Sequence, residues 1–222
     1  NQIENYGDNI SDEAKLICKS VLRNQKETAR AEELLKQEEN QKKKNSKKEK
    51  NPEQEAMIMG WFKEYEEFAQ NHSDLSSHFY FHFKEAEFAT LPYLSMGKQM
   101  DILKNIVDDY RKIEEINPEY GENLFTYGMS LYMAPKIAGG DKKAGIEKIY
   151  KATQVSDTNY EKVSALLVYS QLMFEDKKYD EAKKYLKEAE SLSPSKKRYQ
   201  EIQEMNDAGY SLFKADEYKK KK

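Results

Sequence analysis

Cysteine is almost absent from this chain of 222 residues, because Cys18 is the only one. An internal disulfide is therefore excluded, and so are metal sites that need several thiolates. We expect Cys18 to pack as a small apolar residue, since Leu16, Ile17 and Val21 surround it among helix-forming residues. Glycine (9 residues) and proline (5 residues) are too scarce for a turn-rich β-sandwich.

Long hydrophobic runs are lacking as well. Uncharged stretches are short: Val163 to Phe174, for example, has only 12 residues and includes Ser, Tyr and Gln, so it is too short for a membrane span. The chain begins at Asn1 rather than Met. We therefore expect trimming at the N-terminus, which either a removed secretory or lipoprotein signal or an expression boundary explains. A membrane would then be reached only through a removed N-terminal anchor.

Neither sign of charge predominates. The 37 Lys and Arg residues face 40 Asp and Glu residues, and the formal net charge of −3 gives no basic excess that argues for nucleic acid. With 35% charged and 38% hydrophobic residues, the chain cannot fill a thick α/β core along its whole length. No Ser/His/Asp, Cys/His or paired-acid arrangement can be assembled from the sequence. We therefore expect neither an enzyme nor a cofactor.

The first 50 residues differ from the rest. Ser11, followed by two acidic residues, is typical of a helix start. Residues 36–55 contain no apolar side chain in twenty positions, so they are either a solvent-bridging helix or a disordered linker. Pro52 disfavours any helix directly before it. We interpret residues 1–50 as a charged helical or partly disordered segment and expect the folded domain over 52–222.

Beyond Pro52, apolar residues recur at helical spacing and no segment has the alternation of a strand. The pattern predicts a helix over 54–70, an aromatic-rich helix over 78–93 and further helices to the end of the chain. The predicted fold class is therefore all-α.

An internal repeat is the strongest pattern. Residues 163–196 carry large residues, small residues and a final proline at fixed offsets: Leu166, Tyr169, Ser170, Met173, Ala182, Leu186, Ala189 and Pro194. This spacing resembles the 34-residue helix–turn–helix unit of tetratricopeptide repeat (TPR) proteins. The two alanines allow a close helix contact, and Pro194 ends the second helix.

Two further units precede it. The unit at about 121–159 carries matching residues, with an extended turn over 134–141: Leu124, Tyr127, Gly128, Leu131, Gly145, Ile149 and Ala152. A more degenerate unit covers about 87–120. The resemblance implies a solenoid of antiparallel helix pairs with capping helices at 54–70 and 197–218, because a single unit cannot bury its own apolar face.

The TPR resemblance implies a non-enzymatic scaffold that binds a protein partner on the concave face of its first helices. The candidate partner-binding residues are Tyr93, Asn123, Tyr127, Ser130, Lys136 and Tyr169. The three tyrosines suit such a face, because each combines a ring with a hydroxyl. The same rings are equally suited to packing between helices.

The middle unit suggests an alternative function. With Pro135 ahead of a Gly139-Gly140-Asp141 turn, it also resembles repeats of spirochaete-type bacterial TPR lipoproteins and the T-component of TRAP solute transporters. That resemblance implies a periplasmic or cell-envelope lipoprotein that partners a transporter subunit and can form homo-oligomers. The helix at 78–93 and the glycine turn would then enclose a small-ligand pocket. A cytoplasmic location is the other alternative.

Two short motifs allow more than one interpretation. Asp74, His78 and His82 are spaced four residues apart, as metal ligands on one helix face would be. Surface histidines with Asp74 as helix N-cap also explain these residues. We favour this interpretation because no third metal ligand is evident elsewhere in the sequence. The Gly139–Asp141 turn suits an anion at a helix start, but capping by Asp141 explains the same residues.

Overall fold

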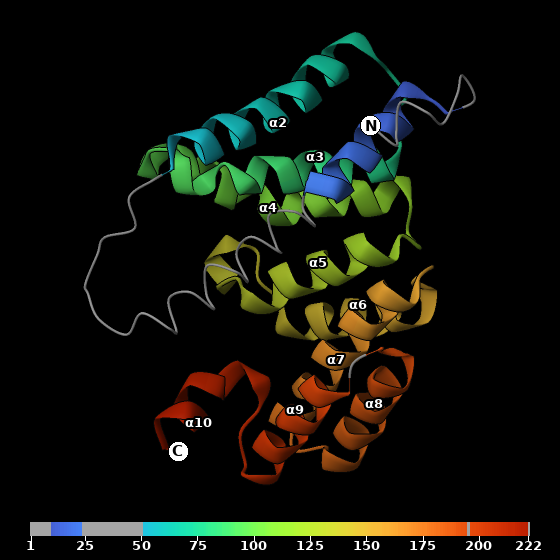
Figure 1. Ribbon diagram of the computed structural model, residues 1–222, viewed down its shortest axis with the longest axis vertical. Coiled ribbons are helices and arrows are strands. Elements are labelled where there is room, and N and C mark those ends of the chain that lie inside the picture. Colours follow the sequence, from blue (N-terminus) through green and yellow to red (C-terminus); the bar gives the residue numbers. More distant parts are fainter. Residues whose placement is uncertain (1–9, 24–50, 195, 222) are drawn as a thin grey trace. The chain divides into compact units, whose positions relative to one another are not determined.

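A computed structural model of the chain describes residues 10–23, 51–194 and 196–221 (Figure 1). Regular structure within these ranges is entirely helical, as the sequence predicts, and contains no strand. The chain divides into two compact units, Asn1–Leu103 and Lys104–Lys222. The boundary falls inside helix α4 (Met96–Ile116) and divides the domain expected over 52–222.

The first unit contains a helix over residues 12–23, and it starts as predicted because the Ser11 hydroxyl accepts a hydrogen bond from the Ala14 N–H at 3.1 Å. Helix α2 (Pro52–Asn71) begins at the expected proline, after Asn51 as N-cap. Cys18 is exposed, so the expectation that it packs as an apolar residue is wrong. The remainder of the charged segment, residues 1–9 and 24–50, lies outside the described residues.

The core of the first unit joins the helix over 12–23 to α2 and to α3 (Ser77–Ala89). Its buried residues are Leu16, Trp61, Tyr65, Leu75, Phe79 and Ala86. Ser20 lies among them, and its hydroxyl accepts the Trp61 indole N–H at 3.0 Å and lies 2.5 Å from the Tyr65 hydroxyl. Burial raises the pKa of Tyr65 to about 12. This small polar network fixes the first helix against α2.

Helix α3 is shorter than the helix predicted over 78–93. It begins after Ser76, whose hydroxyl accepts the Phe79 N–H, whereas Asp74 lies ahead of the helix with a φ of 58°. It ends at Thr90 because Pro92 has no N–H to continue the hydrogen-bond ladder. A 3₁₀ turn, η2 (Leu91–Tyr93), follows, so Tyr93 does not lie on an inner helix.

Residues 87–120 hold one long helix instead of the expected helix pair. The range contains the end of α3, then η2, and then the 21 residues of α4. No proline interrupts the chain between residue 96 and Pro118, so nothing in the sequence ends the helix earlier. Within the second unit, α4 buries Val107, Tyr110 and Ile113.

Helices α5 (Gly121–Met133) and α6 (Lys142–Val155) pack closely through glycine. A Cβ added to Gly128 would lie 2.8 Å from the Gly145 carbonyl oxygen, and one added to Gly145 would lie 2.6 Å from the Gly128 carbonyl oxygen. A Cβ on Gly121, at the start of α5, would meet Ser156 directly after the end of α6. The two helices therefore contact each other in opposite order along the chain.

The connection between α5 and α6 follows the sequence prediction. Helix α5 ends before Pro135, a 3₁₀ turn η3 (Lys136–Ala138) follows, and Gly139 adopts a φ of 82°. Asp141 is the N-cap of α6, and its carboxylate accepts the Lys143 and Ala144 N–H groups at 3.0 and 3.1 Å. Capping by Asp141 therefore occupies two of the free N–H donors at the start of α6.

Helix α6 packs against α7 (Asn159–Glu175), which packs against α8 (Tyr179–Leu192). Helix α7 starts before the predicted unit at 163 because the Thr158 hydroxyl caps it, accepting the Glu161 N–H. Ala182 and Ala189 are buried, as the repeat spacing predicts, and α8 ends at Leu192, shortly before Pro194.

The cap expected as one helix over 197–218 is divided. Helix α9 (Lys197–Asp207) ends in a Schellman motif, with Gly209 at a φ of 86° and the Tyr210 N–H bonded to the Met205 carbonyl at 2.9 Å. A 3₁₀ turn η4 (Leu212–Lys214) and helix α10 (Ala215–Lys221) follow. A left-handed glycine therefore redirects the chain where periodicity alone predicts a continuous helix.

Candidate functional site

Two adjoining pockets lie between α8 and α9, and we call them together the α8/α9 cleft. The first has a cavity volume of about 350 Å³ and the second about 630 Å³, within the range of small-ligand sites. Lys183, Gln203 and Asp207 line both pockets. The start of α8 lies opposite the end of α9 across the first pocket, and the later turns of α8 lie opposite the start of α9 across the second.

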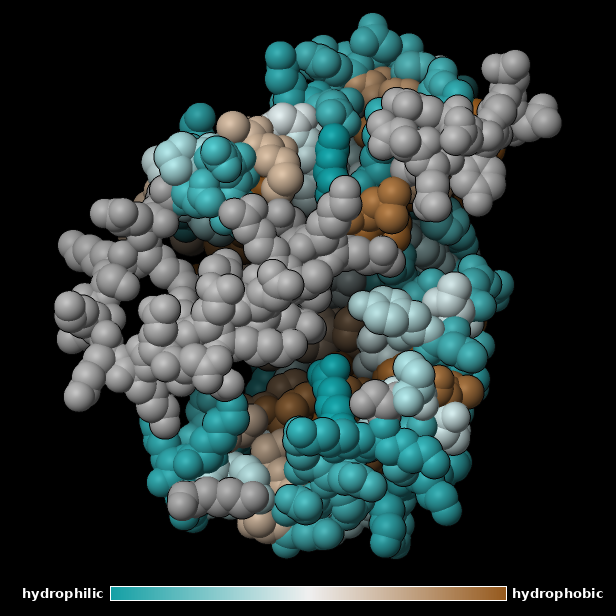
Figure 2. Space-filling model, viewed as in Figure 1, coloured by the Kyte–Doolittle hydropathy of each residue, from teal (hydrophilic) through white to brown (hydrophobic). Residues whose placement is uncertain are grey.

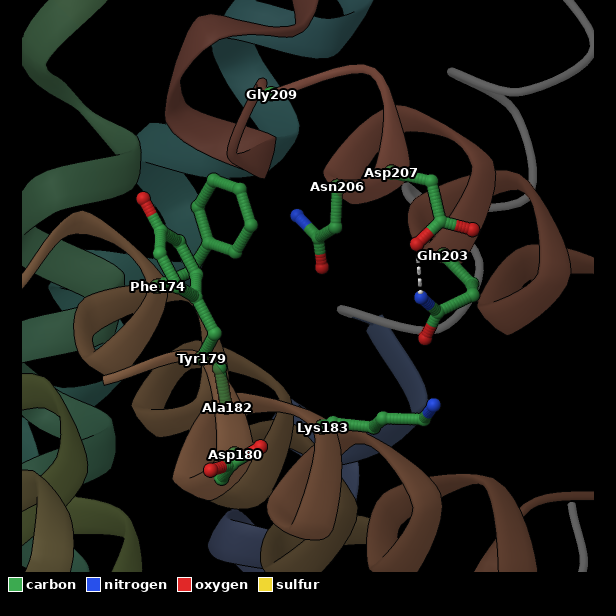
Figure 3. Close-up of a pocket in the computed structure, with 9 residues that line it drawn as sticks. All are labelled: Phe174, Tyr179, Asp180, Ala182, Lys183, Gln203, Asn206, Asp207 and Gly209. Carbon is green, nitrogen blue, oxygen red and sulfur yellow. Dashed lines mark hydrogen bonds between the residues drawn. The ribbon is translucent and has the colours of Figure 1, made fainter. Parts of the chain in front are cut away.

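The walls of the first pocket differ in chemistry, as Figure 3 shows. Phe174 and Tyr179 form one wall with their rings edge to face and 5.2 Å between centroids. The opposite wall carries Asn206, Gln203 and Asp207, and the Gln203 amide donates to the Asp207 carboxylate at 2.7 Å. An aromatic surface therefore lies across from amide and carboxylate groups.

The second pocket has an apolar floor. Leu186 and Tyr199 line it, and both are also buried in the core that α7, α8 and α9 share. The charged residues of the two pockets are four carboxylates and two lysines: Asp180, Glu190, Glu204, Asp207, Lys183 and Lys187. The cleft consequently favours a ligand with net positive charge.

Asn206 connects the cleft to the interior of the second unit. It lines the first pocket, and its side chain exchanges two hydrogen bonds with the amide of Gln171 on α7, at 3.0 and 3.2 Å. Asn206 also donates to the Tyr210 carbonyl at 2.9 Å, which supports the turn after α9. Gln171 is fully buried, so this pair of amides fixes α9 against α7.

The tyrosines predicted to line a concave face lie in different places. Tyr93 belongs to the first unit, whereas Tyr127 and Tyr169 belong to the second. Tyr127 is buried beneath Lys148, whose Nζ lies 4.6 Å from the ring centroid. Lys148 in turn forms an ion pair with Glu114.

Tyr169 lies in a cluster with Tyr150 on α6 and Tyr185 on α8, at centroid distances of 5.1 and 4.9 Å. Burial raises the pKa of Tyr169 to about 12. Tyr127 and Tyr169 thus pack toward the second helices of their units.

The other three candidate partner-binding residues are Asn123, Ser130 and Lys136, and the first two form hydrogen bonds within the second unit. Asn123 is fully buried and donates to the Tyr110 carbonyl at 3.1 Å. The Ser130 hydroxyl donates to the Thr126 carbonyl at 2.9 Å, and Lys136 is exposed on η3.

The histidines of the candidate metal motif have contrasting environments. His78 is exposed at the start of α3, whereas His82 is 7% exposed and its Nδ1 has no hydrogen-bond partner among the described residues. Burial, together with the nearby charge of His78, lowers the pKa of His82 to about 4. Among the residues that the structure describes, no group of three or more His, Cys, Asp or Glu side chains is placed to hold a metal ion.

The cleft residues were not predicted as a site from the sequence. Tyr179 occupies the first position of α8 and is 56% exposed, whereas tyrosines inside the repeat pattern are expected to pack. The opposite wall depends on where α9 packs, and its amides and acids resemble ordinary surface residues in the sequence.

Comparison with known proteins identifies no relative, because no family model, no curated protein and no solved structure matches the chain significantly. Within the described ranges, no helix has both the length and the apolar character that crossing a membrane requires.

Proposed function

We propose that this protein is a non-enzymatic, TPR-like helical scaffold that binds a polypeptide segment of a partner protein in the α8/α9 cleft. The packing of α5 on α6 and of α7 on α8 supports the repeat interpretation, since Gly128, Gly145 and Ala182 occupy the small-residue positions of the TPR pattern. The opposite order of contacts along α5 and α6 is that of an antiparallel pair.

The main support for the proposal is the first pocket of the cleft, in which an aromatic wall faces a wall of amide and carboxylate groups. A polypeptide backbone offers donors and acceptors to the Gln203 amide and an N–H donor to the Asn206 Oδ1, while one of its side chains contacts Phe174 and Tyr179. The excess of carboxylates favours Lys or Arg in that segment, because a cation gains from both the rings and the acids. We therefore expect a basic segment of a protein as ligand.

The transporter-accessory alternative requires an enclosed pocket beside the aromatic helix. Phe79, which would border such a pocket, is fully buried in the core of the first unit and packs against Tyr65 and Phe68. The α8/α9 cleft is open to solvent along one side. An open cleft suits a polypeptide better than an enclosed solute, so we favour the protein-binding function.

A photo-crosslinking amino acid placed at Tyr179 tests the proposal in an extract of the source organism. We expect it to capture a defined partner segment, whereas the same group at Tyr160, which is 82% exposed outside the cleft, does not. A synthetic peptide of that segment should bind wild type about tenfold more tightly than Asp207→Lys, because charge reversal opposes a basic ligand. Asp157→Lys, the same change at an exposed loop position, is the matched control. Equal binding by both variants would contradict the cleft as the site.

A further inference from the structure

The chain's own C-terminal segment, residues 212–221, lies against α5 and α7. After the turn at Gly209, three consecutive residues meet specific groups of the two helices. The Leu212 N–H donates to the Gln171 Oε1 at 2.9 Å, and Lys214 forms an ion pair with Glu175 at 2.9 Å. The Phe213 ring stacks on Tyr132 with 6.2 Å between centroids and 29° between planes. We call Tyr132, Gln171 and Glu175 together the first-helix face.

The first-helix face presents three different recognition groups from two helices. Tyr132 near the end of α5 offers a ring, Gln171 within α7 offers a buried amide oxygen, and Glu175 at the end of α7 offers a carboxylate. Each group meets its complement in the segment: a ring, a backbone N–H and an ammonium group. Packing alone does not require such complementarity, because an apolar cap stabilises the end of a helical stack equally well.

The segment lies at the surface and packs without full burial. No residue of η4 or α10 is buried, and Phe213 is 40% exposed. Leu212, Ala215 and Tyr218 are only partly buried where they pack against the core of the second unit. The Lys214–Glu175 ion pair is partly exposed to solvent, which weakens it. Helix α10 has seven residues and is too short to be stable without packing. Such segments open at a fraction of the free energy of global unfolding.

We propose that residues 212–221 are a detachable occupant of the first-helix face, and that a partner segment presenting an aromatic residue followed by Lys or Arg replaces them. Leu212, Phe213 and Lys214 supply the pattern, since each meets one group of the face. Replacement restores the same three interactions, so Gln171 keeps an N–H donor and Glu175 keeps a cation. This face is separate from the walls of the α8/α9 cleft, and the proposal does not depend on the cleft as a binding site.

A peptide added in trans tests the proposal with the full chain. The probe is a fluorescent synthetic peptide with the sequence of residues 209–221, followed by fluorescence anisotropy. Phe213→Ala with Lys214→Glu weakens the internal contact, so this double variant should bind the peptide about tenfold more tightly than wild type. Adding Glu175→Lys on the face should reduce that binding about tenfold again. Lys219→Glu, an exposed change in the same segment, should bind as weakly as wild type.

Failure of the double variant to bind the peptide would overturn the proposal. So would formation of a dimer by wild type at the concentrations used, because a second copy would then be the occupant. Native-state hydrogen exchange of the unmodified chain gives an independent readout. We expect amides of residues 212–221 to exchange through a local opening while those of α7 stay protected, and equal protection of both would identify a fixed cap instead.

Discussion

A single side chain, His82, gives the first unit a pH-dependent stability. Burial, aided by the charge of His78, lowers its pKa to about 4 in the folded state, whereas an unfolded histidine titrates at about 6.5. Between these two values the unfolded state binds a proton that the folded state does not. We therefore expect the contribution of His82 to the free energy of unfolding to be fully present above about pH 6.5 and to fall by about 1.4 kcal/mol for each pH unit down to about 4.

We expect His82→Leu to remove most of this pH dependence, because leucine occupies the buried site without titrating. Urea unfolding at pH 7 and pH 5, followed by the fluorescence of Trp61, measures the effect in the first unit, since Trp61 is the only tryptophan of the chain. His72→Gln at the exposed end of α2 is the control and should keep the full pH dependence. An identical pH dependence in His82→Leu and wild type would show that other groups cause it.

At the scale of elements, the contact between α5 and α6 depends on two glycines. A Cβ at Gly128 would lie 2.7 Å from the Ile149 Cγ1 and 2.8 Å from the Gly145 carbonyl oxygen, which is backbone and cannot turn aside. Gly128→Ala should therefore lower the free energy of unfolding by about 1–3 kcal/mol despite the better helix propensity of alanine. Far-UV circular dichroism in urea measures this change.

Gly97→Ala in α4 is the matched control for that substitution. It is also a helical glycine, but a Cβ there meets nothing within 4 Å. We expect this change to stabilise the protein by up to about 1 kcal/mol, since it restricts the unfolded chain and favours the helix. If both alanines had the same effect, the close approach of α5 and α6 would not be the cause.

The elements that the sequence predicted well are those whose ends it marks chemically. Ser11, Pro52 and Asp141 begin helices as expected, and Pro135 follows directly after one. The wrong predictions came where apolar periodicity continued through a break, at Pro92 and at Gly209. Proline and glycine both disfavour a continuing helix, so the sequence itself indicates a break at each of these two positions.

The candidate site was less predictable, for a physical reason. Tyr127 and Tyr169 stand at the expected positions on their helices, but which neighbours a ring meets depends on how the helices pack. The α8/α9 cleft depends on where α9 packs, and the contacts of the first-helix face depend on the course of the chain after Gly209. Such tertiary features have no local signature.

On the scale of the whole molecule, four apolar clusters among the described residues each belong to a single unit. The cluster around Trp61 and Phe79 lies wholly within the first unit, and the clusters around Leu166, Ile149 and Leu124 lie wholly within the second. Among the coloured residues in the view of Figure 2, hydrophilic ones predominate at the surface, with smaller hydrophobic areas between them. Helix α4 contains the boundary between the two units and therefore contributes residues to both.

Separate cores predict separate unfolding transitions. Ser20→Ala leaves the Trp61 indole and the Tyr65 hydroxyl without their shared partner, which should cost the first unit about 1–3 kcal/mol. We expect the Trp61 fluorescence transition in urea to move to lower concentration while the later part of the circular dichroism transition keeps its midpoint. Gly128→Ala should do the reverse, because its clash lies in the second unit. If each variant shifted both signals equally, the two units would unfold as one cooperative structure joined through α4.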